Sequence, residues 1–104
     1  MNEKSKYFYE FDSYTLKPDE RILAKDNKPL QLSPRAFDVL VVLVRNSGKL
    51  VEKQDLIEQV WNGQFVEEAN IQVQISVIRK ALDDKNNYKY IETIPKKVIV
   101  STQM

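Results

Sequence analysis

The segment LSPRAFDVLVVLVRNSGK, at residues 32–49, constrains the fold more than any other part of the chain. Ser33 is a typical helix N-cap residue, Pro34 suits the first helical position, and Gly48 stands where a helix would end. Between them, apolar side chains recur at helical spacing, at Phe37, Leu40, Val41 and Val44. The run VLVVLV would also suit a buried strand, but the cap, the proline and the total length favour a helix over residues 33–47. Because this helix is apolar on nearly every side, we expect it to be central and covered on more than one face.

The segments around this helix predict an α+β domain. Residues 6–32 read as four short strands separated by polar turns, which is the pattern of an antiparallel meander. Residues 53–61 and 67–82 have helical spacing, and residues 90–101 contain two β-rich runs around PKK that predict a hairpin. A chain of 104 residues has the length of one domain. We therefore expect one domain over residues 1–104, with a four-stranded N-terminal sheet, three helices and a C-terminal β-hairpin.

Composition excludes several kinds of protein. The chain has no cysteine and no histidine, so the thiolate nucleophile, the commonest general base and the commonest metal ligand are missing. With only two glycines it has no glycine-rich phosphate-binding loop. We therefore expect no enzyme, no cofactor, no bound metal and no small-molecule substrate. No run approaches the ~18 apolar residues of a membrane span, and the absence of cysteine suits the cytoplasm, where thiols stay reduced.

The net charge of +1 by itself favours neither a nucleic-acid binder nor any other class of protein. The distribution of charge is more informative. Toward the end of the chain one acid, Glu92, stands against four lysines: Lys85, Lys89, Lys96 and Lys97. This end is therefore the basic part of the chain.

Residues 67–82 form the longest predicted helix, and its two faces differ in character. One face carries an apolar stripe that suits the core: Ile71, Ile75, Ile78 and Leu82. The opposite face mixes polar side chains with two valines at helical spacing: Asn70, Val73, Ser76, Val77 and Lys80. Gln74 and Arg79 lie at the flanks of this face. Valines on the outer side of a helix need a partner to cover them.

The predicted elements follow one another in the order of a winged helix-turn-helix protein: a short helix, a loop of about five residues, a longer helix and a hairpin. In such folds the longer helix lies in the major groove of DNA, and the hairpin reaches a neighbouring backbone or minor groove. Amide side chains can bond adenine, and valine methyl groups can pack on thymine methyl groups. Arg79 and Lys80, with Lys96 and Lys97 at the hairpin tip, would contact phosphates. The sequence therefore predicts double-stranded DNA as the partner.

At this point the chain resembles a known family. The stretches LSPRAFDVLVVLVRNSGKLVEKQDLIEQVW, FVEEANIQVQISVIRKAL and YIETIPKK agree in order and spacing with the OmpR/PhoB-type winged-helix DNA-binding domain. The resemblance is closest to the membrane-anchored ToxR/CadC-like branch and extends from about Tyr7 to Lys97. It implies the cytoplasmic output domain of a bacterial transcription regulator, with a membrane connection only through another segment of a longer protein.

The resemblance also implies partners and site residues. Members of the family often bind tandem half-sites as dimers, and the loop from Trp61 to Val66 would face RNA polymerase or phosphate. The positions where members contact DNA correspond here to Asn70, Val73, Gln74, Ser76, Val77 and Arg79. Two departures stand out: many members carry arginines in place of Ser76 and Val77, and a Gly-Tyr pair in place of Val98 and Ile99.

Alternative interpretations of the same residues remain open at this level. The fold could serve protein–protein contact, either dimerisation or docking on the transcription machinery, with weak or no DNA binding. Val73 and Val77 could be partly buried by the hairpin or a neighbouring loop, with no ligand at all. Trp61 is expected to belong to the core more than to a binding surface.

Overall fold

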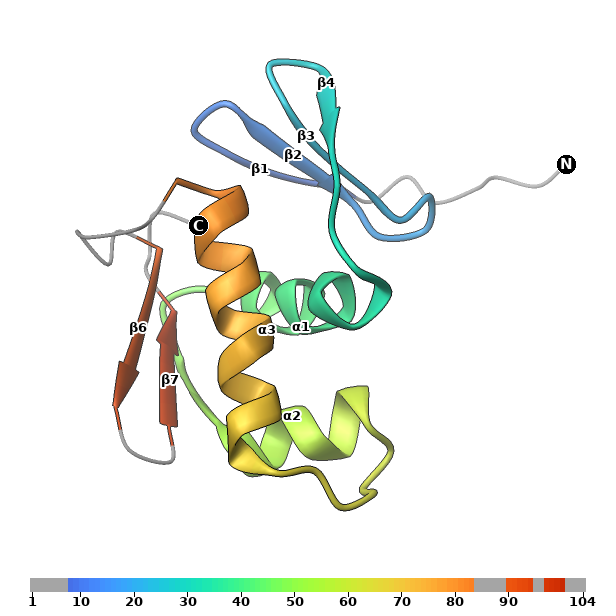
Figure 1. The fold of residues 1–104 in the computed structure, drawn as a ribbon. Helices are drawn as coiled ribbons and strands as arrows, with labels where there is room; N and C mark the ends of the chain where they lie inside the picture. The colour runs from blue at the N-terminus through green and yellow to red at the C-terminus, as the bar shows by residue number, and fades with distance from the viewer. Residues whose placement is uncertain (1–7, 84–89, 95–96, 101–104) are drawn as a thin grey trace, which may run out of the picture.

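The first strands form the meander that the alternating sequence predicts. The computed structural model describes residues 8–83, 90–94 and 97–100 (Figure 1). Its first sheet has the order β1-β2-β3-β4, with every neighbouring pair antiparallel: β1 (Tyr9–Phe11), β2 (Tyr14–Lys17), β3 (Ile22–Lys25) and β4 (Lys28–Leu30). Asp26 and Asn27 join β3 to β4 with φ angles of 53° and 67°, because a two-residue hairpin turn that matches the strand twist needs positive φ. One face of the sheet is buried, at Tyr14, Leu16 and Leu23.

The central helix, α1 (Pro34–Arg45), begins as predicted. The Ser33 hydroxyl accepts a hydrogen bond from the backbone N–H of Ala36 at 3.3 Å, and Pro34 occupies the first turn. Seven of its residues are buried: Ala36, Phe37, Val39, Leu40, Val42, Leu43 and Val44. The helix contacts both α2 (Lys53–Val60) and α3 (Glu68–Ala81), and the first sheet lies over its other side (Figure 1). Coverage on more than one face is therefore confirmed.

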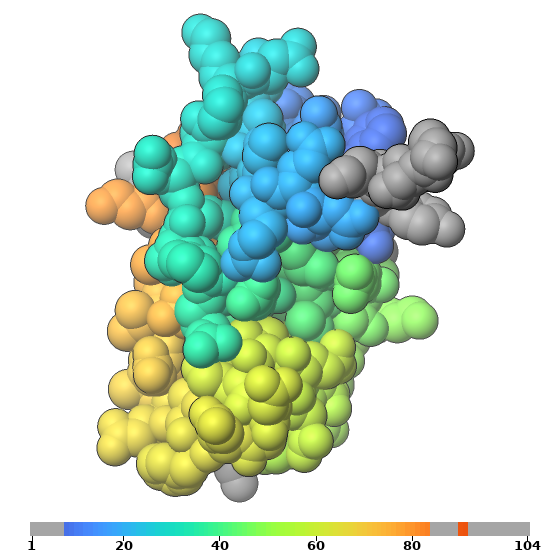
Figure 2. All heavy atoms as spheres, turned by 90° about the vertical axis from the view of Figure 1, so that its right-hand side faces the viewer, coloured from blue at the N-terminus to red at the C-terminus, as the bar shows by residue number. Residues whose placement is uncertain are grey.

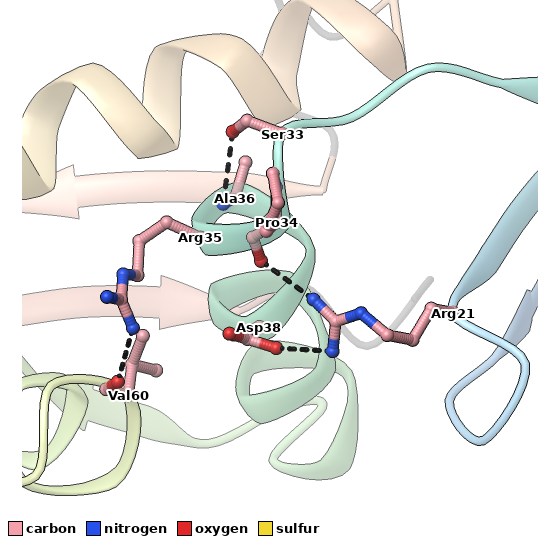
Figure 3. Close-up of polar contacts among 7 residues, drawn as sticks. All are labelled: Arg21, Ser33, Pro34, Arg35, Ala36, Asp38 and Val60. Atoms are coloured by element: carbon pink, nitrogen blue, oxygen red, sulfur yellow. Dashed lines mark hydrogen bonds and ion pairs between the residues drawn. The ribbon is translucent and has the colours of Figure 1, made fainter.

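Arg21, in the turn between β2 and β3, fastens the first sheet to α1. Its guanidinium donates to the Asp38 carboxylate at 2.8 Å and to the carbonyl of Pro34 at 3.1 Å (Figure 3). The same group lies 4.8 Å from the centre of the Phe37 ring, within the range of a cation–π contact. A planar guanidinium can make all three contacts at once, so one side chain sets where the sheet sits on the helix.

The second sheet contains the predicted hairpin and one strand more. The sheet has the order β5-β7-β6 and is antiparallel: β5 (Leu50–Glu52), β6 (Ile91–Ile94) and β7 (Lys97–Val100). The sequence predicts the two-stranded hairpin alone, so β5 is the additional strand. Pairing of β5 with β7 ties the hairpin to the segment that leads directly into α2. With the first sheet and the three helices, this arrangement confirms the α+β winged-helix fold class.

The buried side chains of both sheets and all three helices meet in one hydrophobic cluster. The stripe predicted for the last helix is buried throughout, at Ile71, Ile75, Ile78 and Leu82. Three aromatic rings join the first sheet to the start of β6. The Tyr90 ring meets those of Phe11 and Tyr14 edge-on, with centroids 5.7 and 6.1 Å away, and its hydroxyl donates to the Asp12 carboxylate. In the part of the chain that the structure describes, no helix is long and apolar enough to cross a membrane.

Alkaline pH should weaken this fold through Tyr14 and Lys25. Burial raises the pKa of the Tyr14 hydroxyl, and Lys25 beside it opposes part of that rise. The pKa of Lys25 is raised as well, first by Tyr14 and then by its hydrogen bond to Asp83. Both folded-state pKa values therefore exceed the unfolded ones. The stabilisation from these groups is fully present below pH ~10 and is lost as the pH rises further.

We expect the urea midpoint to fall above pH ~10, and to fall less steeply in Tyr14→Phe than in the parent chain. Urea denaturation across the alkaline range, followed by circular dichroism, measures this. Equal alkaline slopes for the parent chain and the variant would contradict the assignment.

Candidate nucleic-acid interface

The outer face of α3 carries most of the side chains predicted to contact a ligand. Asn70, Val73, Ser76 and Lys80 are exposed, and Gln74 is half-buried at the flank of this face. They lie opposite the buried isoleucine stripe, as the helical period requires. Val73 has 55% of its surface exposed and is the one large apolar residue of α3 that is open to solvent. The result is a polar strip with an apolar centre, which suits the edges of base pairs.

Val77 does not share the exposure of Val73. It is half-buried and packs against the hydrophobic cluster of the core. The two valines are four residues apart, so they are rotated about 40° from each other on the helix. That rotation turns Val77 toward the protein and Val73 toward solvent. The interpretation of partial burial holds for Val77, and Val73 remains available to a partner.

Arg79 makes a structural contact with the protein itself. Its Nε and Nη2 atoms donate to the carbonyl oxygen of Ile91 at 3.2 and 2.7 Å. Ile91 is the first residue of β6 and is fully buried, so the guanidinium joins α3 to β6. The sequence suggested a phosphate contact for this residue. In the structure two of its donors satisfy a buried carbonyl, and the phosphate contact stays a prediction.

The strands β6 and β7 form the wing. Of the two lysines predicted at its tip, the structure describes one, Lys97. Lys97 is the first residue of β7, where it stands opposite Ile94 on β6 and opposite Glu52 on β5. Lys96 lies outside the described residues. Since Glu52 is also the N-cap of α2, the sheet brings the base of the hairpin turn next to the start of the helix-turn-helix unit.

The connection between α2 and α3 is longer than the predicted loop and is held at its beginning. Residues 61–67 form it, because α2 ends one residue earlier and α3 begins one residue later than predicted. Asn62 and Gly63 have φ angles of 54° and 78°, and the Gly63 N–H donates to the carbonyl of Ile57 at 3.0 Å, which closes the end of α2. Trp61 is 8% exposed and belongs to the core, as expected.

Arg35 of α1 fixes this end of α2 from the other side. Its guanidinium donates to the carbonyl of Val60 at 2.8 Å (Figure 3) and lies 5.5 Å from the centre of the Trp61 ring. Beyond this anchored point the loop projects, and Phe65 has 88% of its surface exposed. Figure 2 shows α2 and the loop (yellow-green) at one end of the molecule and the first sheet (blue) at the other.

Sequence analysis missed three contributors to this region: Arg35, Phe65 and the ion pair between Lys53 and Glu68. The Nζ atom of Lys53 lies 2.6 Å from the Glu68 carboxylate. Lys53 is the first residue of α2 and Glu68 the first of α3, so the pair joins the beginnings of the two helices. Opposite charges at the starts of two consecutive helices were visible in the sequence, but their contact depends on how the helices cross.

The comparisons with known proteins agree with this geometry. A family model described as "Transcriptional regulatory protein, C terminal" matches residues 27–97. Transcriptional regulator HilA of Salmonella typhi is 33% identical over 84 residues, which is 81% of this chain and 15% of that protein. The chain belongs to the family of C-terminal domains of transcriptional regulatory proteins, and it spans under a fifth of the length of HilA.

Solved structures give the same result for the fold. The response regulator DrrB of Thermotoga maritima, an OmpR/PhoB homologue, superposes with a TM-score of 0.81 and 27% identity, over 90% of this chain and 44% of that one. The DNA-binding domain of Escherichia coli CadC superposes with a TM-score of 0.72 and 28% identity, over 88% of both chains. The fold and the family are thus those of OmpR/PhoB-type winged-helix domains, as the sequence resemblance implied.

The structural role of Arg79 can be tested against its neighbour. Arg79→Lys loses the two-pronged contact with the Ile91 carbonyl, so we expect the free energy of unfolding to drop by about 1–3 kcal/mol. The exposed Lys80 supplies the matched control, and Lys80→Ala should stay within about 0.5 kcal/mol of the parent. Urea denaturation of both variants measures the difference. If Arg79→Lys were as stable as the parent, the contact with Ile91 would not stabilise the fold, and a phosphate contact would be the better interpretation of Arg79.

Proposed function

We propose that this chain binds double-stranded DNA sequence-specifically, as the output domain of a bacterial transcriptional regulator. Helix α3 lies in the major groove, and the wing contacts the neighbouring backbone or minor groove. The observation that carries the proposal is the outer face of α3, where Asn70, Val73, Ser76 and Lys80 are exposed opposite the buried stripe. A helix of 14 residues is about 21 Å long, and a major groove about 12 Å wide admits it.

Each side chain of this face and its flank suits a particular part of the DNA. The amides of Asn70 and Gln74 offer the paired donor and acceptor that adenine needs in the major groove, and Val73 offers methyl groups to thymine. Ser76 can bond either a base or a phosphate. Lys80, at the end of the helix, contacts a phosphate. Val77 supports this surface from its half-buried position and adds the edge of its side chain.

The wing completes the proposed interface. Lys96 and Lys97 contact phosphates beside the groove, which positions the domain without reading the sequence. Arg79 contributes chiefly by joining α3 to β6, since the Ile91 carbonyl engages its guanidinium. The groove-facing helix and the backbone-facing wing are thereby held as one unit.

Two sets of variants separate base reading from phosphate binding. Gln74→Ala should reduce discrimination between preferred and random DNA by ~1–3 kcal/mol, because its contact is to a base edge. The double variant Lys96→Ala/Lys97→Ala should weaken binding about equally for all sequences and lower the salt slope by up to ~2. Fluorescence anisotropy of a random-sequence duplex and of a selected site, titrated between ~50 and ~200 mM salt, measures both. If Gln74→Ala kept the parent's preference for the selected site over random DNA, Gln74 would not contact a base in the groove.

A protein–protein function is the second candidate, and the exposed Val73 is the observation that favours it. An apolar residue rimmed by amides also suits a protein interface. Such an interface would be nearly insensitive to salt, whereas DNA binding weakens steeply with it. The same titration therefore decides between the two candidates.

The domain has further proposed partners. We propose that the loop at residues 61–67 contacts RNA polymerase through Phe65, whose ring stands in solvent beyond the anchored end of α2. Exposed aromatic side chains are enriched at protein interfaces. A homodimer on tandem DNA half-sites and a cytoplasmic location follow from the proposed role as a regulator. The role is one of binding, with no catalytic step.

Phe65→Ser tests the polymerase contact. The change should leave the Kd for DNA within about twofold, because surface substitutions alter free energies by roughly 0.5 kcal/mol or less. It should abolish the supershift of the protein–DNA complex by bacterial RNA polymerase. Phe8→Ser, at an exposed phenylalanine beside the first sheet, is the control for a simple loss of surface apolarity. An undiminished supershift with Phe65→Ser would exclude the loop as the polymerase contact.

A further inference from the structure

Lys53 is a charged side chain in an unusual place. The residue is only 7% exposed, and among residues 8–83 and 90–91 it is the one buried charged residue. It also occupies the first position of α2, where the positive end of the helix dipole disfavours a cation. Burial and dipole both act against the ammonium group. A charge in such a position requires a partner with good geometry.

Glu68 is that partner. Its carboxylate lies 2.6 Å from Nζ of Lys53, while its own side chain remains 60% exposed. Glu68 is the first residue of α3, so its negative charge is favourable for that helix. Both residues line a groove of about 290 Å³, together with the apolar side chains of Ile57, Val66 and Ile71. The ammonium is thus held from within the protein, and the carboxylate stands at its surface.

The position of Glu68 matters for DNA binding. Glu67 and Glu68 are both exposed, at the end of α3 that belongs to the proposed interface. Double-stranded DNA carries one negative charge for about every 1.7 Å of its axis, so a carboxylate near it reduces affinity. Lys53 compensates one of the two carboxylates and holds it toward the protein. Lys53 donates its hydrogen bond to Glu68 and not to the neighbouring Glu67.

We propose that Lys53 is a positioning residue for DNA binding: from its buried place in α2 it restrains and neutralises the Glu68 carboxylate, so that the start of α3 can approach DNA phosphates. The inference rests on the proposed DNA-binding function. Lys53 acts through Glu68, because its side chain is only 9% exposed and its ammonium group already pairs with that carboxylate.

Five variants test the proposal with a fluorescein-labelled random-sequence duplex. Lys53→Met removes the Lys53 contact from Glu68 and should raise the Kd severalfold over that of the parent at ~50 mM salt. The ratio of the two Kd values should shrink about three- to fourfold by ~200 mM, as one charge less in the salt slope requires. Lys53→Arg keeps the charge and should bind as the parent does. Lys53→Met/Glu68→Gln removes both charges of the pair and should restore the parent Kd and slope. A methionine fits the buried site, and urea denaturation verifies that each variant is folded.

The matched control is Lys53→Met/Glu67→Gln, which has the same net charge as the restored variant but keeps the Glu68 carboxylate without its Lys53 contact. It should bind more weakly than Lys53→Met/Glu68→Gln. Glu67→Gln alone gives the effect of its carboxylate in the parent background. Equal restoration by both double variants would show that only net charge matters, and would overturn the proposal.

The other outcomes are equally distinct. If Lys53→Met/Glu68→Gln stays as weak as Lys53→Met, Lys53 contacts phosphate directly and the proposal fails. A Lys53→Met protein that binds like the parent also overturns it, while the DNA-binding function stands. Absence of binding by the parent chain at ~50 mM salt overturns both together.

Discussion

The burial of α1 is the constraint on which the rest of the structure depends. A helix with buried residues on most of its circumference is stable in water only when other elements cover it on several sides. The first sheet covers one side, and α2 and α3 cover the others. Two arginines fix the angles of this packing, because Arg21 joins the sheet to α1 and Arg35 joins α1 to the end of α2. Each donates to a backbone carbonyl, so each contact sets the position of a chain segment as well as a side chain.

The proposed DNA-binding surface inherits its rigidity from this core. Helix α3 buries its isoleucine stripe against the rest of the domain, so its outer face points in a fixed direction. The two ends of α3 are then held by charged groups: Lys53 pairs with Glu68 at the start, and Arg79 donates to the Ile91 carbonyl near the end. The second contact reaches the wing, which β5 also ties to α2. Preorganisation of this kind reduces the entropy lost when a surface binds its partner.

Helical periodicity predicted correctly which residues of α3 belong to the core. It also predicted that four side chains face outward: Asn70, Val73, Ser76 and Lys80. It was less informative at the edges of the outer face. Val77 and Arg79 are both half-buried there, since the core partly covers the valine and β6 engages the guanidinium. Periodicity gives the direction of a side chain from its own helix. It contains no information about which other segment lies in that direction.

The sequence by itself determined the local structure: the cap at Ser33 and Pro34, the antiparallel meander, the three helices and the buried stripe. These features depend on residues close together in the chain, where propensity and period act directly. Only the tertiary structure decided that β5 joins the wing, that Arg79 bonds Ile91, and that Lys53 pairs with Glu68. Those contacts join residues distant in sequence, and they exist because packing around α1 fixes how the other elements cross. Burial then favours them, since a buried charge or carbonyl is costly unless it is paired.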